Sequence, residues 1–203
     1  MKIICIGRNY RDHAKELNND IPTEPVIFLK PDTAVLKDGQ DFYLPDLFQE
    51  VHHEVELLVR IDRHGKNIQS KFAHKYYTQI GLGIDFTARD KQSELKSKGL
   101  PWELAKAFDG SAFISSWHAK EDFGDLMNLE FSLTKNGAMA QKGTSADMLF
   151  SIDEMIAFVS QYFTLRTGDI LFTGTPAGVS AVQKGDELEG FIQNQKLFTL
   201  RVK

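Results

Sequence analysis

The sequence predicts an α+β fold, a mixed, folded-over β architecture that carries only a few short helices. Segments rich in β-branched and apolar residues recur along the whole chain of 203 residues, and such segments are typical of strands. Regular helices of roughly 10–15 residues do not separate them, which argues against a doubly wound parallel sheet. No linker, repeat or low-complexity tract divides the chain, so we expect residues 1–203 to form a single domain.

The first quarter of the chain should contain short strands joined by loops. Residues 3–6 are apolar, which predicts a short buried strand that ends at Gly7. Residues 8–17 are polar and rich in helix formers, and this predicts a short helix or turn. Pro22, Pro25 and Pro31 then break the chain, with a strand expected at residues 26–29 between them.

Two longer strands and a helix are expected next. Residues 50–61 and 78–86 are rich in β-branched and apolar side chains, which predicts strands. A helix should follow the second strand, with Thr87 as its N-cap and Asp90 in a near capping box. The run Gly99-Leu100-Pro101 should end that helix.

The second half should consist mainly of strands and turns. Residues 129–134 alternate between apolar and polar, and Asn136-Gly137 predicts a hairpin turn because both residues tolerate positive φ. Ser151 and Glu154 form a capping box that should open a helix reaching about residue 162. Further strands are expected at residues 169–172 and 197–202, and a loop at residues 173–178.

Composition limits the classes of partner and compartment. The formal net charge is −4 and no basic stripe is present, so we do not expect nucleic acid as a partner. Cys5 is the only cysteine, which excludes an internal disulfide and a thiolate metal cluster and fits a reducing compartment. No apolar stretch approaches the roughly 20 residues of a membrane helix, and the N-terminal apolar run is too short for a signal peptide. The expected location is the cytoplasm, without a membrane partner.

Three carboxylates are candidates for a metal site. Glu54 and Glu56 lie two residues apart on a predicted strand, so their side chains should share one face with that of His52. Asp85 ends the next long strand. Three carboxylates can meet only where a cation offsets their repulsion, and three oxygen donors suit Mg²⁺ or Mn²⁺ better than Zn²⁺. The simpler alternative is a solvated strand face, which alternate Glu residues usually mark.

Seven segments together resemble the fumarylacetoacetate hydrolase family, within it the acylpyruvase or oxaloacetate decarboxylase-like branch. Any one of them could arise by chance, whereas the full series in family order is specific. The segments are Gly7-Arg8-Asn9-Tyr10 with Asp12-His13, Phe28-Leu29-Lys30-Pro31, His52-His53-Glu54-Val55-Glu56-Leu57, Asp85-Phe86-Thr87-Ala88-Arg89-Asp90, Gly99-Leu100-Pro101-Trp102, Leu104-Ala105-Lys106, and Thr173-Gly174-Thr175-Pro176-Ala177-Gly178-Val179.

The resemblance implies a mixed β-roll of the fumarylacetoacetate hydrolase C-terminal-domain type, a homodimer and a small 2-oxo acid substrate. It also implies that Glu54, Glu56 and Asp85 bind Mg²⁺ (or Mn²⁺). The namesake hydrolase has an extra N-terminal domain, whereas this sequence starts directly in the catalytic segment, so we do not expect fumarylacetoacetate itself as the substrate. The remaining implied site residues are Arg8, Arg89, Gln92 and Thr175 for substrate binding, and His13, Glu16 and Lys106 for catalysis.

Lys106 and the pair of His13 and Glu16 each have a chemical role and a simpler alternative. Lys106 could donate to the enolate oxygen that forms when a 1,3-dicarbonyl is cleaved, although most lysines are solvated. His13 and Glu16 are three apart and share a helix face. Glu16 could orient the imidazole, and His13 could then deprotonate the attacking water. The alternative for this pair is an incidental contact on an exposed helical turn.

Arg89 and Gln92 are also three apart, in the first turn of the helix expected after Asp85. A helix N-terminus favours anions, which suits a substrate carboxylate. Arg89 could instead pair with Asp90 or Glu94 at the surface.

The expected function is a Mg²⁺-dependent hydrolase that cleaves the C–C bond of acylpyruvates through a metal-bound pyruvate enolate, and that also decarboxylates oxaloacetate. The first alternative is an isomerase or tautomerase of 2-hydroxy-dienoates or enol-oxaloacetate. His13 and Glu16 count against it, since a water-activating pair would be idle. The second alternative is a non-catalytic, metal-dependent 2-oxo acid binding protein, which would have no use for Lys106 or His13.

Overall fold

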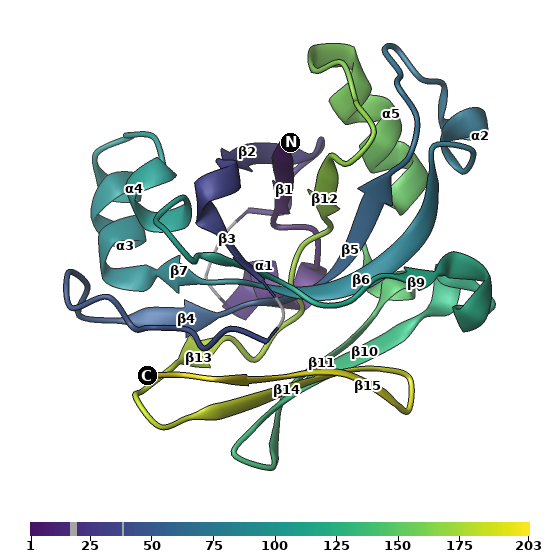
Figure 1. Ribbon diagram of the computed structural model, residues 1–203. Helices are drawn as coiled ribbons and strands as arrows, with labels where there is room; N and C mark the ends of the chain where they lie inside the picture. Colours follow the sequence, from purple (N-terminus) through teal and green to yellow (C-terminus); the bar gives the residue numbers. More distant parts are fainter. Residues whose placement is uncertain (17–19, 38) are drawn as a thin grey trace.

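A curled, mixed sheet forms the centre of the protein (Figure 1). The computed structural model describes residues 1–16, 20–37 and 39–203. Within these residues the sheet has eight strands in the order β2-β1-β12-β5-β6-β8-β3, with β9 beside β6. The pairs β1–β12 and β3–β8 are parallel and the others antiparallel. The strands are β1 (Ile3–Gly7), β2 (Val26–Lys30), β3 (Val35–Lys37), β5 (Val55–Ile61), β6 (Tyr77–Asp85), β8 (Ala112–Ile114), β9 (His118–Ala119) and β12 (Ile170–Phe172).

Two smaller sheets complete the β architecture in the described chain. A four-stranded antiparallel sheet lies beneath the large one in Figure 1. The aromatic rings of Phe113 and Phe198, one from each sheet, pack with centroids 4.6 Å apart, so the two layers share a core. The four strands are β10 (Glu130–Lys135), β11 (Ala138–Thr144), β14 (Glu187–Ile192) and β15 (Gln195–Arg201), and the three-stranded sheet contains β13 (Ser180–Ala181), β4 (Val51–His53) and β7 (Thr87–Ala88).

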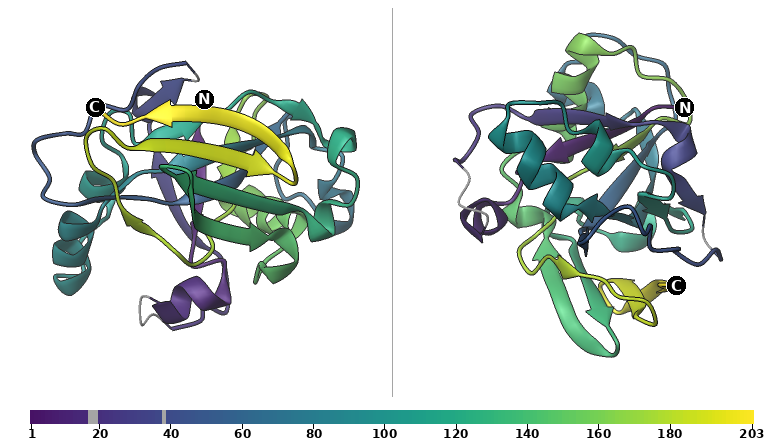
Figure 2. Two further views of the ribbon diagram at one scale, coloured as in Figure 1. Left: turned by 90° about the horizontal axis from the view of Figure 1, so that it is seen from below. Right: turned by 90° about the vertical axis from the view of Figure 1, so that its left-hand side faces the viewer.

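The helices are short and lie at the margins of the sheets. Figure 2 shows α3 and α4 together at one edge of the molecule. None of the helices in the described ranges combines the length and apolar character needed to cross a membrane. The α-helices are α1 (Arg11–Glu16), α2 (Ser70–Ala73), α3 (Arg89–Ser97), α4 (Glu103–Lys106) and α5 (Ile152–Tyr162), and single 3₁₀ turns occur at Asp32–Ala34, Lys120–Phe123, Leu126–Asn128 and Ser145–Asp147. The α+β class with few helices is therefore confirmed.

Several local predictions are confirmed. Asn136 and Gly137 have φ values of +54° and +78° and turn β10 into β11. Ser151 and Glu154 form the complete capping box at the start of α5. The helix expected within residues 8–17 is α1, and residue 17 lies outside the described residues.

Two predictions around the carboxylates are wrong in detail. The strand expected at residues 50–61 is divided at Glu54 into β4 and β5. Thr87 is not the N-cap of α3: it pairs with His52 in β7, and Ala88 occupies the N-cap position without a capping side chain. The Thr87 hydroxyl instead donates to the Asp85 carbonyl and accepts a hydrogen bond from Lys106. The Thr87 hydroxyl, which was expected to cap the helix, therefore bonds to residues of the carboxylate cluster.

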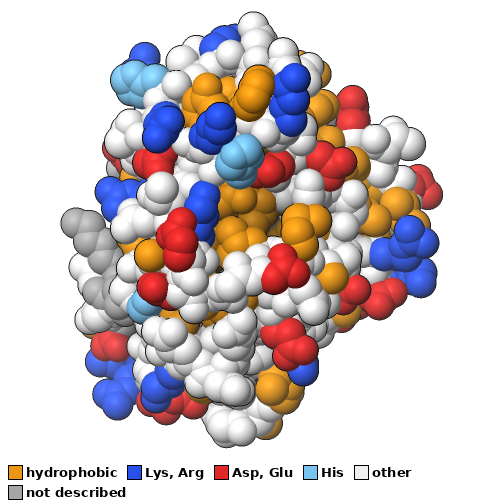
Figure 3. Space-filling view, turned by 90° about the vertical axis from the view of Figure 1, so that its right-hand side faces the viewer, with side chains coloured by type: hydrophobic (Ala, Val, Ile, Leu, Met, Phe, Trp, Pro, Cys, Tyr) orange, Lys and Arg blue, Asp and Glu red, His pale blue; other side chains and the backbone are white. Residues whose placement is uncertain are grey.

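Charged side chains of both signs are distributed over the surface. On the face shown in Figure 3, basic and acidic groups of the described residues alternate around a small apolar area, without a broad basic surface. A nucleic-acid backbone would need such a surface.

Candidate active site

Three buried carboxylates meet where β5 and β6 run side by side. The antiparallel register pairs Val55 with Ile84, and the Asp85 backbone N–H donates to the Glu54 carbonyl at 2.8 Å. Glu54, Glu56 and Asp85 are 5%, 2% and 0% exposed. One oxygen of each lies within 4.8 Å of the others. The structure therefore brings together the three residues that the sequence suggested as metal ligands.

Three cations surround these carboxylates. The Lys106 ammonium donates to Glu54 Oε2 at 2.8 Å and to Asp85 Oδ2 at 2.6 Å. Lys30 Nζ lies 2.7 Å from Asp85 Oδ1. Arg89 donates to Glu54 Oε1 at 2.5 Å. Within this buried cluster the three cations thus pair with two of the carboxylates, Glu54 and Asp85.

The carboxylates nevertheless differ in their ionisation. Burial alone would raise the pKa of Glu54, but Lys106 and Arg89 hold it well below its usual range. Burial, followed by the charges of Asp85 and Glu54, raises the pKa of Glu56 well above its usual range. The Gly174 N–H, which donates to Glu56 Oε2 at 2.7 Å, offsets only part of this rise in pKa. Glu56 is therefore the carboxylate whose charge is least compensated by the protein.

This donor set fits a hard divalent cation. The cluster offers only carboxylate oxygens, which Mg²⁺ and Mn²⁺ prefer, and no thiolate or imidazole of the described residues belongs to it. A cation bound between the three oxygens would offset the repulsion that raises the pKa of Glu56. Glu54, Glu56 and Asp85 are thus a candidate divalent metal site, with the identity of the ion open.

Two lysines contribute differently from what the sequence suggested. All three hydrogens of the Lys106 ammonium face protein acceptors, namely Glu54, Asp85 and Thr87 Oγ1 at 2.6 Å. In this arrangement Lys106 orients the carboxylates, and it would have to release one bond to reach a substrate. Sequence patterns predict no role for Lys30, which is fully buried and stands in the Phe28-Leu29-Lys30-Pro31 segment. A lysine within an apolar strand was the signal for a buried ion pair.

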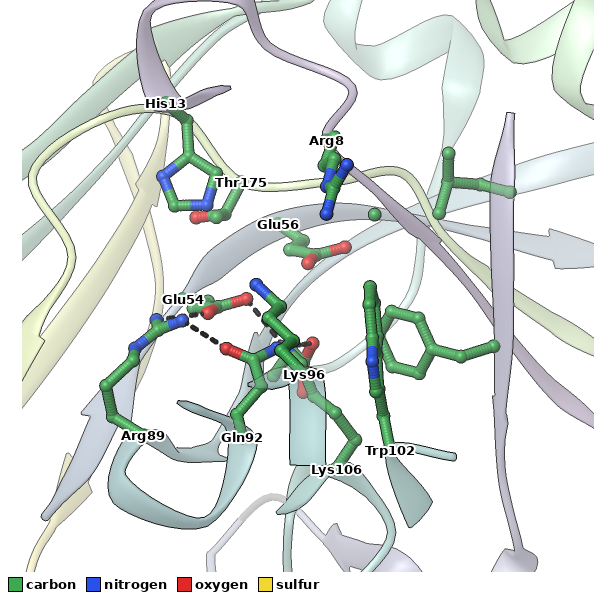
Figure 4. A pocket seen from close by; sticks show the side chains of 14 residues that line it. Arg8, His13, Glu54, Glu56, Arg89, Gln92, Lys96, Trp102, Lys106 and Thr175 are labelled. Carbon is green, nitrogen blue, oxygen red and sulfur yellow. Dashed lines mark hydrogen bonds and ion pairs between the residues drawn. The ribbon is translucent and has the colours of Figure 1, made fainter. Parts of the chain in front are cut away.

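The His13 and Glu16 pair forms as expected and is anchored to the loop at residues 173–178. His13 Nδ1 lies 3.1 Å from Glu16 Oε2, and the other Glu16 oxygen accepts a hydrogen bond from the Gly178 N–H at 3.1 Å. His13 is 6% exposed and lines the pocket, with its second ring nitrogen facing the carboxylates (Figure 4). Gly178 has φ +99°, and a Cβ there would lie 2.4 Å from the Ala140 carbonyl oxygen, so only glycine fits.

Thr175 lines the pocket, but its hydroxyl is already engaged. It donates to the Val55 carbonyl at 2.8 Å and accepts from Gln141 at 2.9 Å. Gln141 also accepts hydrogen bonds from the Val55 N–H and from buried His53. Burial lowers the pKa of His53 to about 4, so its ring is neutral in this network. Gln141 and His53 fix the loop beside the carboxylates, a role that no sequence pattern indicated.

One face of α3 completes the pocket. Arg89, Gln92 and Lys96 follow the spacing i, i+3, i+7 and all line the cavity. Arg89 donates to Gln92 at 2.6 Å and also contacts His52, not Asp90 or Glu94. Arg8 enters from the opposite side, and Trp102 forms a wall beside Lys96 (Figure 4). Lys96 was missed from the sequence, although its spacing from Arg89 was a usable signal.

Comparison with known proteins gives a single family. Residues 2–203 match the family model described as "Fumarylacetoacetate (FAA) hydrolase C-terminal". The chain is 44% identical to the mitochondrial oxaloacetate tautomerase FAHD1 of Rattus norvegicus, over 94% of this chain and 86% of that protein. It is 42% identical to the oxaloacetate tautomerase YcgM of Escherichia coli (strain K12), over 98% of this chain and 91% of that protein.

A solved structure of similar fold contains ligands. The fumarylpyruvate hydrolase from Pseudomonas aeruginosa in complex with Mn²⁺ and pyruvate superposes with a TM-score of 0.94. It is 33% identical and the match covers 100% of this chain and 89% of that chain. The β-roll topology expected from the sequence segments is thereby confirmed. The relatives are enzymes named for small organic acids.

Proposed function

This chain belongs to the fumarylacetoacetate hydrolase family, and from that premise we propose that it is a divalent-metal-dependent enzyme whose main reaction is the keto–enol tautomerisation of oxaloacetate. The observation that most supports this proposal is the His13–Glu16 pair, which faces three buried carboxylates across a small pocket. The relatives named oxaloacetate tautomerase support the choice of reaction.

The substrate is oriented with its 2-oxo acid end toward Glu54, Glu56 and Asp85. A divalent cation held there would supply Lewis-acid stabilisation of the negative charge that develops on the C2 oxygen during enolisation. Arg89 and Gln92 lie beside Glu54, and the Gln92 amide nitrogen has no partner among the described residues. These two side chains position the adjacent carboxylate of the substrate.

His13 transfers the proton. In the direction from enol to keto, one proton leaves the C2 hydroxyl and one is added to C3, so no atom is gained or lost overall. Glu16 accepts from Nδ1 and fixes the tautomer in which Nε2 can exchange a proton with the substrate. The Gly178 N–H holds Glu16 in place for this step.

The same pair also suits hydrolysis of acylpyruvates, because an imidazole that exchanges protons with C3 could equally deprotonate a water. Its presence therefore does not count against a tautomerase. The fumarylpyruvate hydrolase of similar structure favours hydrolysis as the second candidate activity. Decarboxylation of oxaloacetate passes through the same enolate and is expected as a slower side reaction.

The test uses the purified chain with Mg²⁺ or Mn²⁺. The disappearance of enol-oxaloacetate is followed by its ultraviolet absorbance, and pyruvate release from oxaloacetate and from acetylpyruvate is measured in parallel, each with and without EDTA. Metal-dependent tautomerisation that is faster than either release of pyruvate is the expected result. Faster pyruvate release from acetylpyruvate would make the hydrolase the main function, and no turnover of any substrate would refute a catalytic role.

The role of the pair is tested with His13→Gln and Glu16→Gln. Losing a positioned acid–base group typically lowers the rate by roughly 10²–10⁴-fold. His64→Gln is the matched control, since His64 is exposed and remote from the pocket. Equal tautomerisation rates in His13→Gln and His64→Gln would refute the assignment of His13.

Three further expectations belong to this proposal. Residues 1–203 form one catalytic domain, the protein assembles as a homodimer, and it acts in the cytoplasm. Met1 and Leu104 are exposed apolar side chains that border one shallow hollow, and such surface supports self-association. Light scattering of the purified protein tests the dimer, since a monomer mass at micromolar concentration would exclude a stable one.

A further inference from the structure

Two cationic side chains line the pocket without an anionic partner. Arg8 makes no hydrogen bond or ion pair within the described ranges, and its Nε is buried and unsatisfied. Lys96 makes no ion pair with any described carboxylate, and its ammonium lies 5.2 Å from the centroid of the Trp102 ring. Arg89, Lys106 and Lys30 differ from them, because each is paired with Glu54 or Asp85.

The backbone holds Arg8 in this position at a cost. Arg8 has φ +59°, a left-handed conformation that is unfavourable for a non-glycine residue. Asn9 maintains it: its fully buried amide donates to the Thr173 carbonyl at 2.8 Å and accepts from the Phe150 N–H at 2.8 Å. Strained residues that are held so firmly are often found at ligand sites. The result is a guanidinium directed into the cavity from the side opposite α3 (Figure 4).

Lys96 is positioned by the same helix as the other pocket residues. It lies seven residues after Arg89, on the same face of α3, and its ammonium lies over the Trp102 ring. Burial, then the charges of Arg8, Arg89 and Lys106, lowers the pKa of Lys96 to about 8. Because its surroundings destabilise the protonated form of Lys96, any anion that enters the pocket would stabilise that form. Figure 4 shows Arg8 and Lys96 approaching the same space beside Glu56 from opposite sides.

We propose that Arg8 and Lys96 form a subsite for a second carboxylate, which makes the pocket selective for short 2-oxo dicarboxylates over monocarboxylates of equal length. The inference rests on the proposed function, because the 2-oxo acid end of the ligand has to occupy Glu54, Glu56, Asp85 and Arg89. The end of a four-carbon substrate that is remote from the keto group then reaches the two free cations. Lys96 is a specificity residue in this arrangement and takes no part in proton transfer.

The test compares two stable four-carbon ligands that differ only at the distal end. Malate carries a carboxylate there and 2-hydroxybutanoate a methyl group, while both can chelate Mg²⁺ through their carboxylate and hydroxyl groups. Their Kd values are measured by calorimetry with Mg²⁺ present, for the wild type, Lys96→Met, Lys96→Arg and Lys98→Met. Lys98 is the matched control, since it lies two residues further along, is exposed and pairs with Glu94.

The wild type should bind malate more tightly than 2-hydroxybutanoate. A hydrogen bond to a charged group contributes about 1.5–3 kcal/mol, which is roughly tenfold to hundredfold in Kd. Lys96→Met should remove most of this preference without weakening 2-hydroxybutanoate, Lys96→Arg should restore it, and Lys98→Met should behave as the wild type. The subsite proposal is overturned if the wild type binds malate and 2-hydroxybutanoate with equal Kd. It is also overturned if Lys96→Met keeps the preference for malate.

These measurements distinguish a failure of the subsite proposal from a failure of the proposed function. If the wild type discriminates between the ligands but does not tautomerise oxaloacetate, the subsite stands and the reaction assignment fails. If oxaloacetate is tautomerised and Lys96→Met keeps the wild-type kcat/KM for it, the reaction stands and the subsite fails.

Discussion

Replacing Glu56 by Gln should stabilise the metal-free protein at neutral pH and abolish its response to Mg²⁺. Burial and the charges of Asp85 and Glu54 raise the pKa of Glu56 in the folded state above 4.5. The contribution of this group to stability is therefore fully present below pH 4.5 and is lost as the pH rises through the folded pKa. Since each pKa unit corresponds to about 1.4 kcal/mol, the loss of stability between pH 4.5 and pH 7 is at most about 3.5 kcal/mol.

Electrostatics gives a similar magnitude. Two unit charges at 4.8 Å, the limit within which the three carboxylate oxygens lie, repel each other by about 3.5 kcal/mol at an effective dielectric constant of roughly 20. Lys106 and the Gly174 N–H offset part of the repulsion on Glu56. A net gain of about 1–3 kcal/mol in Glu56→Gln would raise Tm by roughly 2–12 °C for a chain of this size.

The assay is thermal unfolding in EDTA at pH 5 and pH 7, and then at pH 7 with increasing Mg²⁺. The wild type should lose stability between the two pH values in EDTA and regain about 2.7 kcal/mol at a metal concentration of 100 Kd. Glu56→Gln should lack both effects, whereas the exposed control Glu121→Gln should show them. A Glu56→Gln protein that is less stable than the wild type in EDTA, or that still responds to Mg²⁺, would refute the reasoning.

Three further predictions follow from the same geometry. KM for oxaloacetate should rise above about pH 8, where Lys96 loses its proton, and Lys96→Arg should shift that rise to higher pH in steady-state kinetics. Lys30→Met removes one partner of a buried ion pair with Asp85. Denaturant titrations should show a loss of about 3–5 kcal/mol of unfolding free energy. A smaller loss than in the exposed control Lys98→Met would contradict this prediction. Gly178→Ala would bring a Cβ to 2.4 Å from the Ala140 oxygen, so it should lower kcat for tautomerisation at least tenfold by displacing the loop, while unchanged kinetics would show that the loop adapts.

The fold class could be predicted because strand signals in this chain are local. The alternation at residues 129–134 and the Asn136-Gly137 turn are confirmed, as is the capping box of α5, since each depends on neighbours within a few residues. The break of the long strand at Glu54 could not be predicted. It arises from tertiary pairing, because β4 joins β7 and β13 while β5 joins β6 and β12.

The site could be predicted only where residue identity and spacing were sufficient. Glu54, Glu56 and Asp85 meet as expected, since alternate strand positions share a face. Thr87 carried a strong local signal for a helix cap, yet its hydroxyl is used by Lys106, so the carboxylate cluster overrides local propensity. Lys30 and Gln141 act across 34 or more positions of sequence, and no local pattern reports such contacts.

The local charge of the pocket differs in sign from that of the whole protein. The chain carries a formal net charge of −4, which by itself does not favour anionic ligands. The formal charges of the three carboxylates are balanced by Arg89 and Lys106, which line the pocket, and by Lys30, which is buried against Asp85. A divalent cation would add two positive charges, and Arg8 with Lys96 add two more, so the substrate-free pocket would be strongly positive. A monoanionic ligand would leave most of this charge uncompensated, whereas a dianion offers one carboxylate to each end. This charge distribution is the physical reason to expect a dicarboxylate.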